Sequence, residues 1–433
     1  MRTIIIFFLC LPFFSHAQDC GEIGQSLGLV SQEAIDNWEY IGCQHFNGSI
    51  SIESFSNEGT PITDLSPLRS LVSIGGNLQI NDNDSLMQID FLNQLKVIGG
   101  DLLITKNPLL KELSFEALES VEKDMHITEN ENLLQINAGA ALIELGSLHL
   151  TSNKNMERVT GFEALNKVHG DFTVIGNSRL SEVPSFNKID SIFGQMLFSG
   201  NLAVTNLHFL DSVEYIKNSI TIFNMQELKK LKAFNNLESH MDFVSLALLP
   251  SLKELNILAS LKEMQGDLST NSLHVLEQLH LCNVLETFKG NISIRVNQEL
   301  TSIDAFASLK ILEGHLNISH NMALTSLQGF NLLHTIKGQL SFTQNAQLQK
   351  IDNFKSLKNV QEMSLFGNDV LSSAQAFNNL NSKAINKFRI KNNFNFDPCQ
   401  FSFLCDIINK EGVTIENNSG NCPDLPTAKS NCN

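Results

Sequence analysis

The chain has 433 residues, with 30 basic and 46 acidic side chains and a formal net charge of −16. An acidic balance with no basic cluster in the sequence argues against nucleic acid or an anionic membrane as a partner. Only 18% of the residues are charged, which is expected of a chain that packs much of its length inward.

The N-terminal stretch MRTIIIFFLCLPFFSHAQ combines Arg2, an apolar run and small residues before Gln18. This pattern predicts a secretory signal over residues 1–17, cut after Ala17 and too short to span a membrane as a helix. Cys10 follows Leu9 where a lipoprotein signal would have a small residue, so we expect no lipid anchor. The mature chain is therefore expected to be exported and to have no membrane span.

Residues 18–46 are expected to form an N-terminal cap. Apolar residues between Glu22 and Tyr40 have the spacing of a short amphipathic helix. Such a helix would cover the end of a repeat core, which otherwise exposes apolar surface and strand edges. The apolar positions are Leu27, Val30, Ala34, Ile35 and Trp38.

A repeat of 23 to 25 residues occupies residues 47–395. A phrase of the form Gly-x-Leu-x-Ile recurs, and a further apolar position follows eight and eleven residues later, as at Leu324 and Leu327 after Leu316. Short alternating segments separated by polar turns predict parallel strands stacked in coils. About fourteen coils would make a rod roughly 65 Å long. The phrase begins at Leu78, Leu102, Met125, Leu148, Phe172, Met196, Ile220, Val244, Leu268, Ile292, Leu316, Leu340, Met363 and Phe388.

Asparagine recurs five residues after the start of the phrase. Stacked amides satisfy backbone groups at a buried corner, so we interpret the column as a structural ladder. Its members are Asn83, Asn107, Asn130, Asn153, Asn177, Asn201, Asn297, Asn321, Asn345, Asn368 and Asn393. Met225, Leu249 and Leu273 interrupt it, which leaves two readings open: an uninterrupted rod with an apolar replacement, or a seam at 217–264 between two halves.

Glycine precedes the phrase in most coils, for example at Gly100, Gly290 and Gly338. No such glycine lies in a strand, Gly-rich loop and helix arrangement followed by lysine, so a phosphate loop is not expected. Corner geometry with a positive φ is the expected role.

Six of the seven cysteines after the signal lie near the two ends of the chain. In an exported protein they predict disulfide-stapled caps. Residues 396–433 would form the C-terminal cap, with Cys399 to Cys405 and Cys422 to Cys432 as the first guess among three connectivities. Cys282 falls on an apolar column and is expected to be a buried thiol.

The segment from Cys20 through the expected helix to Cys43-Gln-His-Phe-Asn-Gly48-Ser-Ile50-Ser-Ile52 resembles the start of a receptor L domain. This is the ligand-binding module of the insulin and epidermal growth factor receptors. The resemblance implies a right-handed parallel β-helix related to leucine-rich repeats, an all-β fold, and a disulfide from Cys20 to Cys43. The C-terminal segment resembles the Cys-rich end of secreted bacterial repeat proteins.

A horseshoe leucine-rich repeat has leucine two residues after its asparagine. Here Leu110 lies three residues after Asn107, and Gly100 precedes the strand, which favours the β-helix. The number of coils exceeds that of receptor modules, so the chain is either two fused L domains or one long solenoid.

Parallel β-helices also include polysaccharide lyases and hydrolases, so columns of acidic residues and of histidines are candidate catalytic or metal sites. Asp101, Asp124 and Asp171 lie one residue before the strand, and His126 and His149 lie one residue after its start. Neither set converges on a further ligand or base. We therefore expect no catalytic residue, metal or cofactor.

The outward positions of the repeated strand provide a better site hypothesis. Alternation points five residues of three neighbouring coils outward, and three of them are apolar. They are Thr173, Ile175, Leu197, Thr221 and Phe223.

The expected function is that of a non-enzymatic binding or adhesion module, secreted or at a cell surface, with a protein or glycan ligand. The alternatives are a carbohydrate-active β-helix enzyme and a structural surface-layer spacer. The sequence does not determine the oligomeric state.

Overall fold

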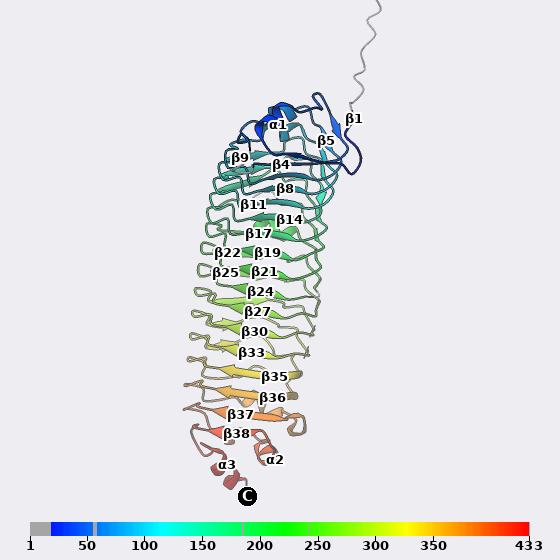
Figure 1. Cartoon of the computed structure of the whole chain (residues 1–433). Helices are drawn as coiled ribbons and strands as arrows, with labels where there is room; N and C mark the ends of the chain where they lie inside the picture. The colour runs from blue at the N-terminus through cyan, green and yellow to red at the C-terminus, as the bar shows by residue number, and fades with distance from the viewer. Residues whose placement is uncertain (1–18, 55–58, 184–185, 241, 433) are drawn as a thin grey trace, which may run out of the picture.

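A computed structural model describes residues 19–54, 59–183, 186–240 and 242–432. These residues wind into an elongated stack of parallel coils, with the chain advancing from one end of the rod to the other (Figure 1). The all-β solenoid expected from the repeat is confirmed. The signal predicted at 1–17 lies outside the described residues.

One side of the rod is the main sheet, in which every strand pairs in parallel with the strand of the next coil. It contains the fourteen strands expected from the repeated phrase, preceded by β2 and β4 and followed by β38. The strands are β2 (Ser26–Leu29), β4 (Ser49–Glu53), β6 (Leu78–Asn81), β8 (Leu102–Thr105), β11 (Met125–Thr128), β14 (Leu148–Thr151), β17 (Phe172–Ile175), β19 (Met196–Ser199), β21 (Ile220–Phe223), β24 (Val244–Ala247), β27 (Leu268–Asn271), β30 (Ile292–Arg295), β33 (Leu316–Ser319), β35 (Thr335–Thr343), β36 (Asn359–Phe366), β37 (Lys387–Lys391) and β38 (Val413–Glu416).

A second side follows the asparagine corner, and a third side leads back to the main sheet. The second side has β9 (Glu112–Ser114), β12 (Gln135–Asn137), β15 (Arg158–Thr160), β22 (Lys230–Ala233), β25 (Glu254–Ile257), β28 (Gln278–Leu281), β31 (Ser302–Ile303) and β34 (Ser326–Leu327). The third side has β1 (Asp19–Cys20), β3 (His45–Phe46), β5 (Ser73–Ile74), β7 (Val97–Ile98), β10 (Ser120–Val121), β13 (Glu144–Leu145), β16 (Lys167–Val168), β18 (Ser191–Ile192), β20 (Tyr215–Ile216), β23 (Ser239–His240), β26 (Glu263–Met264), β29 (Thr287–Phe288) and β32 (Ile311–Leu312).

Short helices occupy turns and caps. The α-helices are α1 (Gln32–Asp36), α2 (Leu404–Ile407) and α3 (Leu425–Asn431). The 3-10 helices are η1 (Ser66–Leu68), η2 (Asp90–Gln94), η3 (His208–Ser212), η4 (Gln375–Asn379), η5 (Ser382–Ala384) and η6 (Pro398–Gln400).

The core is one continuous apolar column inside the coils. The first and third residues of every repeated phrase are buried, because alternation sends them inward while the second and fourth point outward. Phe306, Phe330 and Phe354 stack on successive coils, with ring centroids 5.3 and 5.2 Å apart. Each coil therefore completes its core only with its neighbours.

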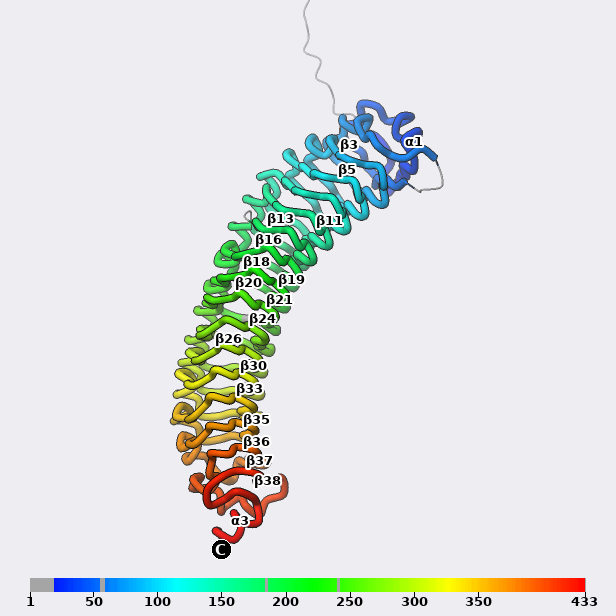
Figure 2. The backbone as a smooth tube through the Cα atoms, turned by 90° about the vertical axis from the view of Figure 1, so that its left-hand side faces the viewer, coloured from blue at the N-terminus to red at the C-terminus, as the bar shows by residue number. Residues whose placement is uncertain are grey.

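In the region 217–264, for which a seam was one of two readings, the main sheet continues without interruption. β21 pairs with β24 over four residues, and β24 pairs with β27 in the same way. The rod curves through its N-terminal half and is straighter beyond it (Figure 2). Parallel pairing thus joins the two halves of the rod into one stack.

The N-terminal cap differs from the expected helix in its first part. Residues Ser26–Leu29 form strand β2 and pair with β4, because this segment already serves as the first rung of the main sheet. The helix is confined to α1, where the Ser31 hydroxyl accepts a hydrogen bond from the backbone N–H of Ala34. Ile35 and Trp38 are buried and cover the end of the core.

Close stacking, and not a positive φ, explains the corner glycines. A Cβ on Gly338 would lie 2.6 Å from the carbonyl oxygen of Gly314 on the preceding coil. The corner glycines Gly100, Gly290, Gly314 and Gly338 are absent from the positive-φ positions of the described chain. The expected conformational role was therefore wrong, because the coils approach one another too closely for a side chain at this corner.

Positive φ occurs instead at the residue before each ladder position, mostly at residues other than glycine. Lys106 has φ 53°, Glu129 has φ 54° and Ser152 has φ 58°. A second such column runs through buried residues such as Phe306 (φ 60°) and Phe330 (φ 62°). Left-handed backbone costs about 1–2 kcal/mol at a residue with a Cβ, so these turns are maintained by the packing of the coil.

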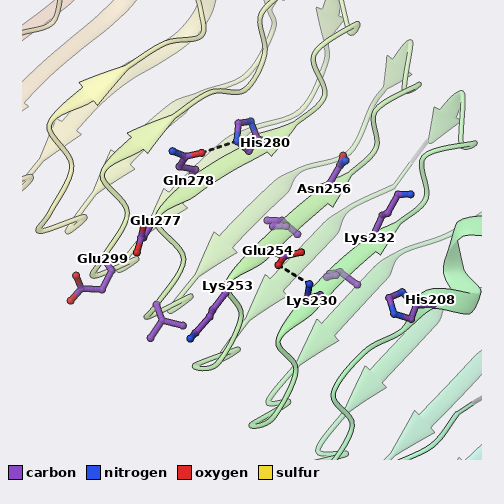
Figure 3. A pocket seen from close by; sticks show the side chains of 13 residues that line it. His208, Lys230, Lys232, Lys253, Glu254, Asn256, Glu277, Gln278, His280 and Glu299 are labelled. Carbon is purple, nitrogen blue, oxygen red and sulfur yellow. Dashed lines mark hydrogen bonds and ion pairs between the residues drawn. The ribbon is translucent and has the colours of Figure 1, made fainter.

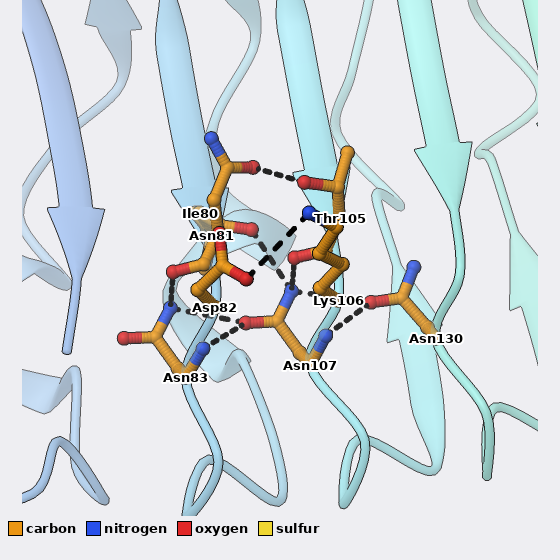
Figure 4. Close-up of polar contacts among 8 residues, drawn as sticks. All are labelled: Ile80, Asn81, Asp82, Asn83, Thr105, Lys106, Asn107 and Asn130. Carbon is orange, nitrogen blue, oxygen red and sulfur yellow. Dashed lines mark hydrogen bonds and ion pairs between the residues drawn. The ribbon is translucent and has the colours of Figure 1, made fainter. Parts of the chain in front are cut away.

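The asparagine column forms a hydrogen-bonded ladder at the corner after the main sheet (Figure 4). The Nδ2 of Asn107 donates to the carbonyl oxygen of Ile80 at 2.9 Å and to the Oδ1 of Asn130 at 3.1 Å. The backbone N–H of Asn107 donates to the same Oδ1 at 3.0 Å. Each buried amide thus links three consecutive coils, and Asn418 adds a further rung beyond Asn393.

The asparagine residues on both sides of the apolar interruption keep their hydrogen bonds to the backbone. The Nδ2 of Asn201 donates to the carbonyl oxygen of Val174 at 2.7 Å and contacts the sulfur of Met225 on the next coil, while its Oδ1 accepts from Asn177. On the other side, the backbone N–H of Leu273 donates to the Oδ1 of Asn297 at 3.0 Å. Met225, Leu249 and Leu273 are buried, so apolar packing replaces the ladder over three coils.

Three disulfides close the two ends. Cys20 pairs with Cys43, as the family resemblance implied. At the other end Cys399 pairs with Cys422, and Cys405 pairs with Cys432, so the guessed pairings within each short segment were wrong. The three bonds join residues separated by 23, 23 and 27 positions, which is about one coil. Stacking places residues one coil apart side by side, and this explains the connectivity.

Candidate binding surfaces

The outward face of the main sheet presents two side-chain columns in register. On β17, β19 and β21 the first column contains Thr173, Leu197 and Thr221, and the second contains Ile175, Ser199 and Phe223. The five residues singled out in the sequence therefore lie on three neighbouring strands. Ile175 and Phe223 flank Ser199, and Leu197 lies between the two threonines.

Thr173, one of the five residues, is not accessible at the surface. It is only 4% exposed, and its hydroxyl lies 2.7 Å from the Nδ1 of His149. Ile175, Leu197 and Thr221 are half-buried, whereas Phe223 is 39% exposed. The accessible part of this cluster is thus centred on Phe223.

Two further apolar residues extend the cluster, which we call the Phe223 patch. Phe243 precedes β24 and Leu248 follows it, and both are exposed. They lie at the two ends of the strand that pairs with β21. The sequence pattern missed them because they lie just outside the alternating strand. The Phe223 patch comprises Ile175, Leu197, Phe223, Phe243 and Leu248.

A groove of about 950 Å³ lies on the second side of the rod (Figure 3). β22, β25 and β28 form its floor, and each has four residues where the other second-side strands have two or three. These are the coils in which the asparagine ladder is interrupted. Val275 contributes apolar surface to the lining, whereas Leu231 and Leu255, which also line the groove, are buried.

The groove separates charges along the rod. Lys230 and Lys232 lie on β22, Lys253 precedes β25, and Glu277 and Glu299 lie further along (Figure 3). Lys229, Lys230 and Lys232 are neighbours in the sequence, and this short basic segment was the available signal. Stacking of the next coil brings Lys253 close to it.

Part of this charge is compensated within the protein. Lys230 forms an ion pair of 2.8 Å with Glu254, and Lys232 lies 3.8 Å from Asp211. His280 bridges Asp304 at 3.1 Å and Gln278 at 3.2 Å. Such exposed pairs contribute little to stability, so their charges remain able to interact with a ligand.

The carboxylates considered for catalysis bind the backbone of the next coil. The Oδ1 of Asp101 accepts from the N–H of Asp124 at 3.2 Å, and the Oδ1 of Asp171 accepts from Gln195 at 2.9 Å. Asn77 makes the same bond to Asp101. An amide and a carboxylate are thus interchangeable in this corner column.

His126 and His149 stack with ring centroids 4.3 Å apart and an interplanar angle of 19°. The His126 Nε2 lies 3.9 Å from the Oδ2 of Asp124. Burial, followed by the neighbouring His126, lowers the pKa of His149, while Asp124 and Asp171 oppose this change. The hydroxyl of Thr173 is the partner of His149 in this stack. The arrangement indicates that the two histidines have a packing role on the sheet face.

Asp397, Cys399 and Cys422 bring possible metal ligands close together at the C-terminal end. The two sulfur atoms are joined in a disulfide. The Asp397 carboxylate accepts from the backbone N–H groups of Cys399 at 2.9 Å and Cys422 at 3.2 Å. Because these backbone N–H groups bind the Asp397 carboxylate and the two sulfur atoms are bonded to each other, we interpret the cluster as a cap of η6 and not as a metal centre.

Across the described ranges, no helix combines the length and apolar character needed to cross a bilayer.

Comparison with known proteins finds similarity to a family over part of the chain. Residues 42–139 match the model of the family described as Receptor L domain. A solved structure of a leucine-rich repeat protein from Bacteroides ovatus is similar at 14% sequence identity and a TM-score of 0.33, over 75% of this chain and 76% of that one. The search of curated proteins found no match.

The matched segment includes Cys43, the first ladder asparagines and strands β4 to β12. The same strand pairing and ladder continue through the later coils. The parallel solenoid therefore extends well beyond the segment that is similar to the Receptor L domain family.

Proposed function

We propose that this chain is a secreted or cell-surface binding module that performs no catalysis and presents the main sheet to an extracellular protein. Receptor L domains are ligand-binding modules, and the match over residues 42–139 supports this class of function. Three disulfides are consistent with an oxidising compartment. Export through the predicted signal at 1–17 is part of the proposal.

The Phe223 patch is the observation that carries the choice of ligand site. Phe223 on β21 is 39% exposed, and Phe243, directly before the adjacent strand β24, is 43% exposed, on a sheet whose other outward positions are mostly polar. Burial of aromatic rings is a principal source of binding energy at protein interfaces. A protein surface with complementary apolar side chains is therefore the favoured ligand, ahead of a glycan.

The sheet beneath the patch is preorganised. β17, β19, β21 and β24 pair in register over four residues at each step. A surface whose backbone is already fixed loses little conformational entropy on binding. The solenoid therefore supports recognition by a rigid face and does not require a loop to close.

The test is a binding screen of the chain from Gln18 onward against purified extracellular proteins and a glycan array. Phe223→Asp is run in parallel, and we expect it to weaken saturable protein binding at least tenfold, because a charge would be buried in the interface. Phe366→Asp is the matched control, since Phe366 occupies the same outward column on β36 and is 36% exposed.

Equal losses in both variants, or unchanged binding in Phe223→Asp, would remove the patch as the site. Turnover of a glycan would instead support the carbohydrate-active alternative. A complete lack of binding would support the structural spacer.

A further inference from the structure

We propose that the groove on β22, β25 and β28 is a second binding site, which takes an extended segment of a partner protein with acidic side chains at one end and basic side chains at the other. The proposal goes beyond the main-sheet function, because the groove lies around the asparagine corner on a different side of the rod. It rests on the arrangement of charge over successive coils.

The basic end of the groove is formed by Lys230, Lys232 and Lys253 on two adjacent coils. The acidic end is formed by Glu277 and Glu299 on the next two coils (Figure 3). Neighbouring strands are about 4.8 Å apart, so β22 and the coil of β31 are separated by roughly 14 Å. The groove thus changes sign along the rod axis over a defined distance.

The charges in the middle of this gradient lack partners in the protein. Lys253, Glu277 and Glu299 have no ion pair within the described part of the chain, whereas Lys230 is paired with Glu254. An incoming ligand can therefore interact with both signs without first breaking an internal pair. Lys230 and Lys232 reinforce the basic end.

The two signs define the chemistry of the ligand. A polyanion would meet Glu277 and Glu299 at the acidic end, and the net charge of −16 repels it at long range. An extended peptide rises about 3.3 Å per residue, so about four residues bridge the basic and acidic ends. A protein segment with separated charges satisfies both ends, and the half-buried Val275 offers an apolar contact to its side-chain stems.

Two labelled hexapeptides of identical composition test the proposal by fluorescence anisotropy at low ionic strength. The first has the order Asp-Asp-Gly-Ser-Lys-Lys, and the second alternates the charges as Asp-Lys-Gly-Ser-Asp-Lys. We expect saturable binding of the first at least fivefold tighter than the second, weakening as salt is added. An all-acidic hexapeptide and heparin serve as the polyanion arms.

Lys253→Glu and Glu277→Lys each reverse one unpaired charge of the groove. Each is expected to weaken binding of the first peptide by about fivefold, since an attraction is exchanged for a repulsion. Lys289→Glu and Glu263→Lys make the same changes in net charge on the third side of the same coils and should leave binding within twofold. Circular dichroism confirms that each variant is folded.

Equal affinity for the two isomers, tighter binding of either polyanion, no saturable binding, or equal losses in the third-side controls would each overturn the proposal. Phe223→Asp should leave peptide affinity unchanged. The outcome for the groove is therefore separate from the outcome for the Phe223 patch.

Discussion

Asn130 illustrates how one side chain maintains three coils. Its Nδ2 donates to the carbonyl oxygens of Ile104 at 2.9 Å and Thr128 at 3.1 Å, and its Oδ1 accepts from Asn107. Ile104 and Asn107 are buried, and the bond to Thr128 is partly buried. A buried group left without a hydrogen bond costs about 1–3 kcal/mol, so the loss of one rung affects both neighbouring coils.

Replacement of Asn130 by Ala is expected to lower the free energy of unfolding by about 3 kcal/mol, because donors and acceptors on two coils lose their partners. Denaturation in urea, followed by circular dichroism, measures this change. Asn132→Ala provides the control, since its Nδ2 donates to Pro108 in an exposed turn, and its cost should be below about 1 kcal/mol. Similar losses in both variants would argue against the ladder as the source of stability.

His149 should make stability depend on pH. Burial and the neighbouring His126 lower the pKa of His149 in the folded protein, whereas the unfolded chain has the usual value of about 6.5. The unfolded state therefore binds more protons as the pH falls through 6.5, and the free energy of unfolding decreases. Stability from this group is present above about pH 6.5 and is lost on acidification.

Urea midpoints at pH 7.5 and 5.5 measure this dependence. We expect His149→Gln to show a smaller decrease between the two pH values than the unchanged protein. His334→Gln is the control at an exposed histidine. An identical decrease in the His149 variant would show that other groups cause the acid sensitivity.

At the scale of the turn, positive φ provides a second test. Glu129 has φ 54° on the turn before Asn130. Glu129→Gly should raise the free energy of unfolding by about 0.5–1 kcal/mol, because removal of the Cβ relieves more strain than the added freedom of the unfolded chain costs. Glu131→Gly, two residues further along the same turn, should lower it. Thermal denaturation of the two variants distinguishes these signs, and a loss in both would contradict the strain argument.

The cap connectivity is tested chemically. Proteolysis without reduction, followed by mass spectrometry, should recover peptides linked through Cys399–Cys422 and Cys405–Cys432. Cys282 should react with a thiol reagent only after denaturation, because burial raises the pKa of its thiol and blocks access. Recovery of Cys399 linked to Cys405 would contradict the stacking of the cap.

The repeat made much of the element scale predictable. The position of each phrase specified a main-sheet strand from Leu78 to Phe388, because alternation and period are properties of the sequence. The first rung at Ser26–Leu29 was not recognised, since its apolar spacing also suits a helix and only pairing with β4 distinguishes the two. The corner glycines were located correctly, but the contact between coils that explains them is tertiary.

At the scale of the whole molecule, the length of the sequence repeat predicted a solenoid, but it did not predict which residues form each of its surfaces. The Phe223 patch was found in part, because outward positions follow from alternation, whereas the burial of Thr173 depends on His149 of the neighbouring coil. The charged groove was not predicted, because Lys253, Glu277 and Glu299 lie 21 to 67 positions after Lys232 in the sequence. Such a surface is recognisable only after the coils are superimposed.

The one-coil span of the three disulfides has a mechanical consequence. In a stack whose coils contact only their neighbours, tension applied to a terminus would detach the coils one at a time, starting from that end. Each disulfide ties a terminal coil to the one beside it, so detachment cannot begin at either end until a covalent bond is cut. Rupture under tension must then start inside the rod, where interfaces on two sides must yield together, and a reductant should convert one large rupture into a series of small steps.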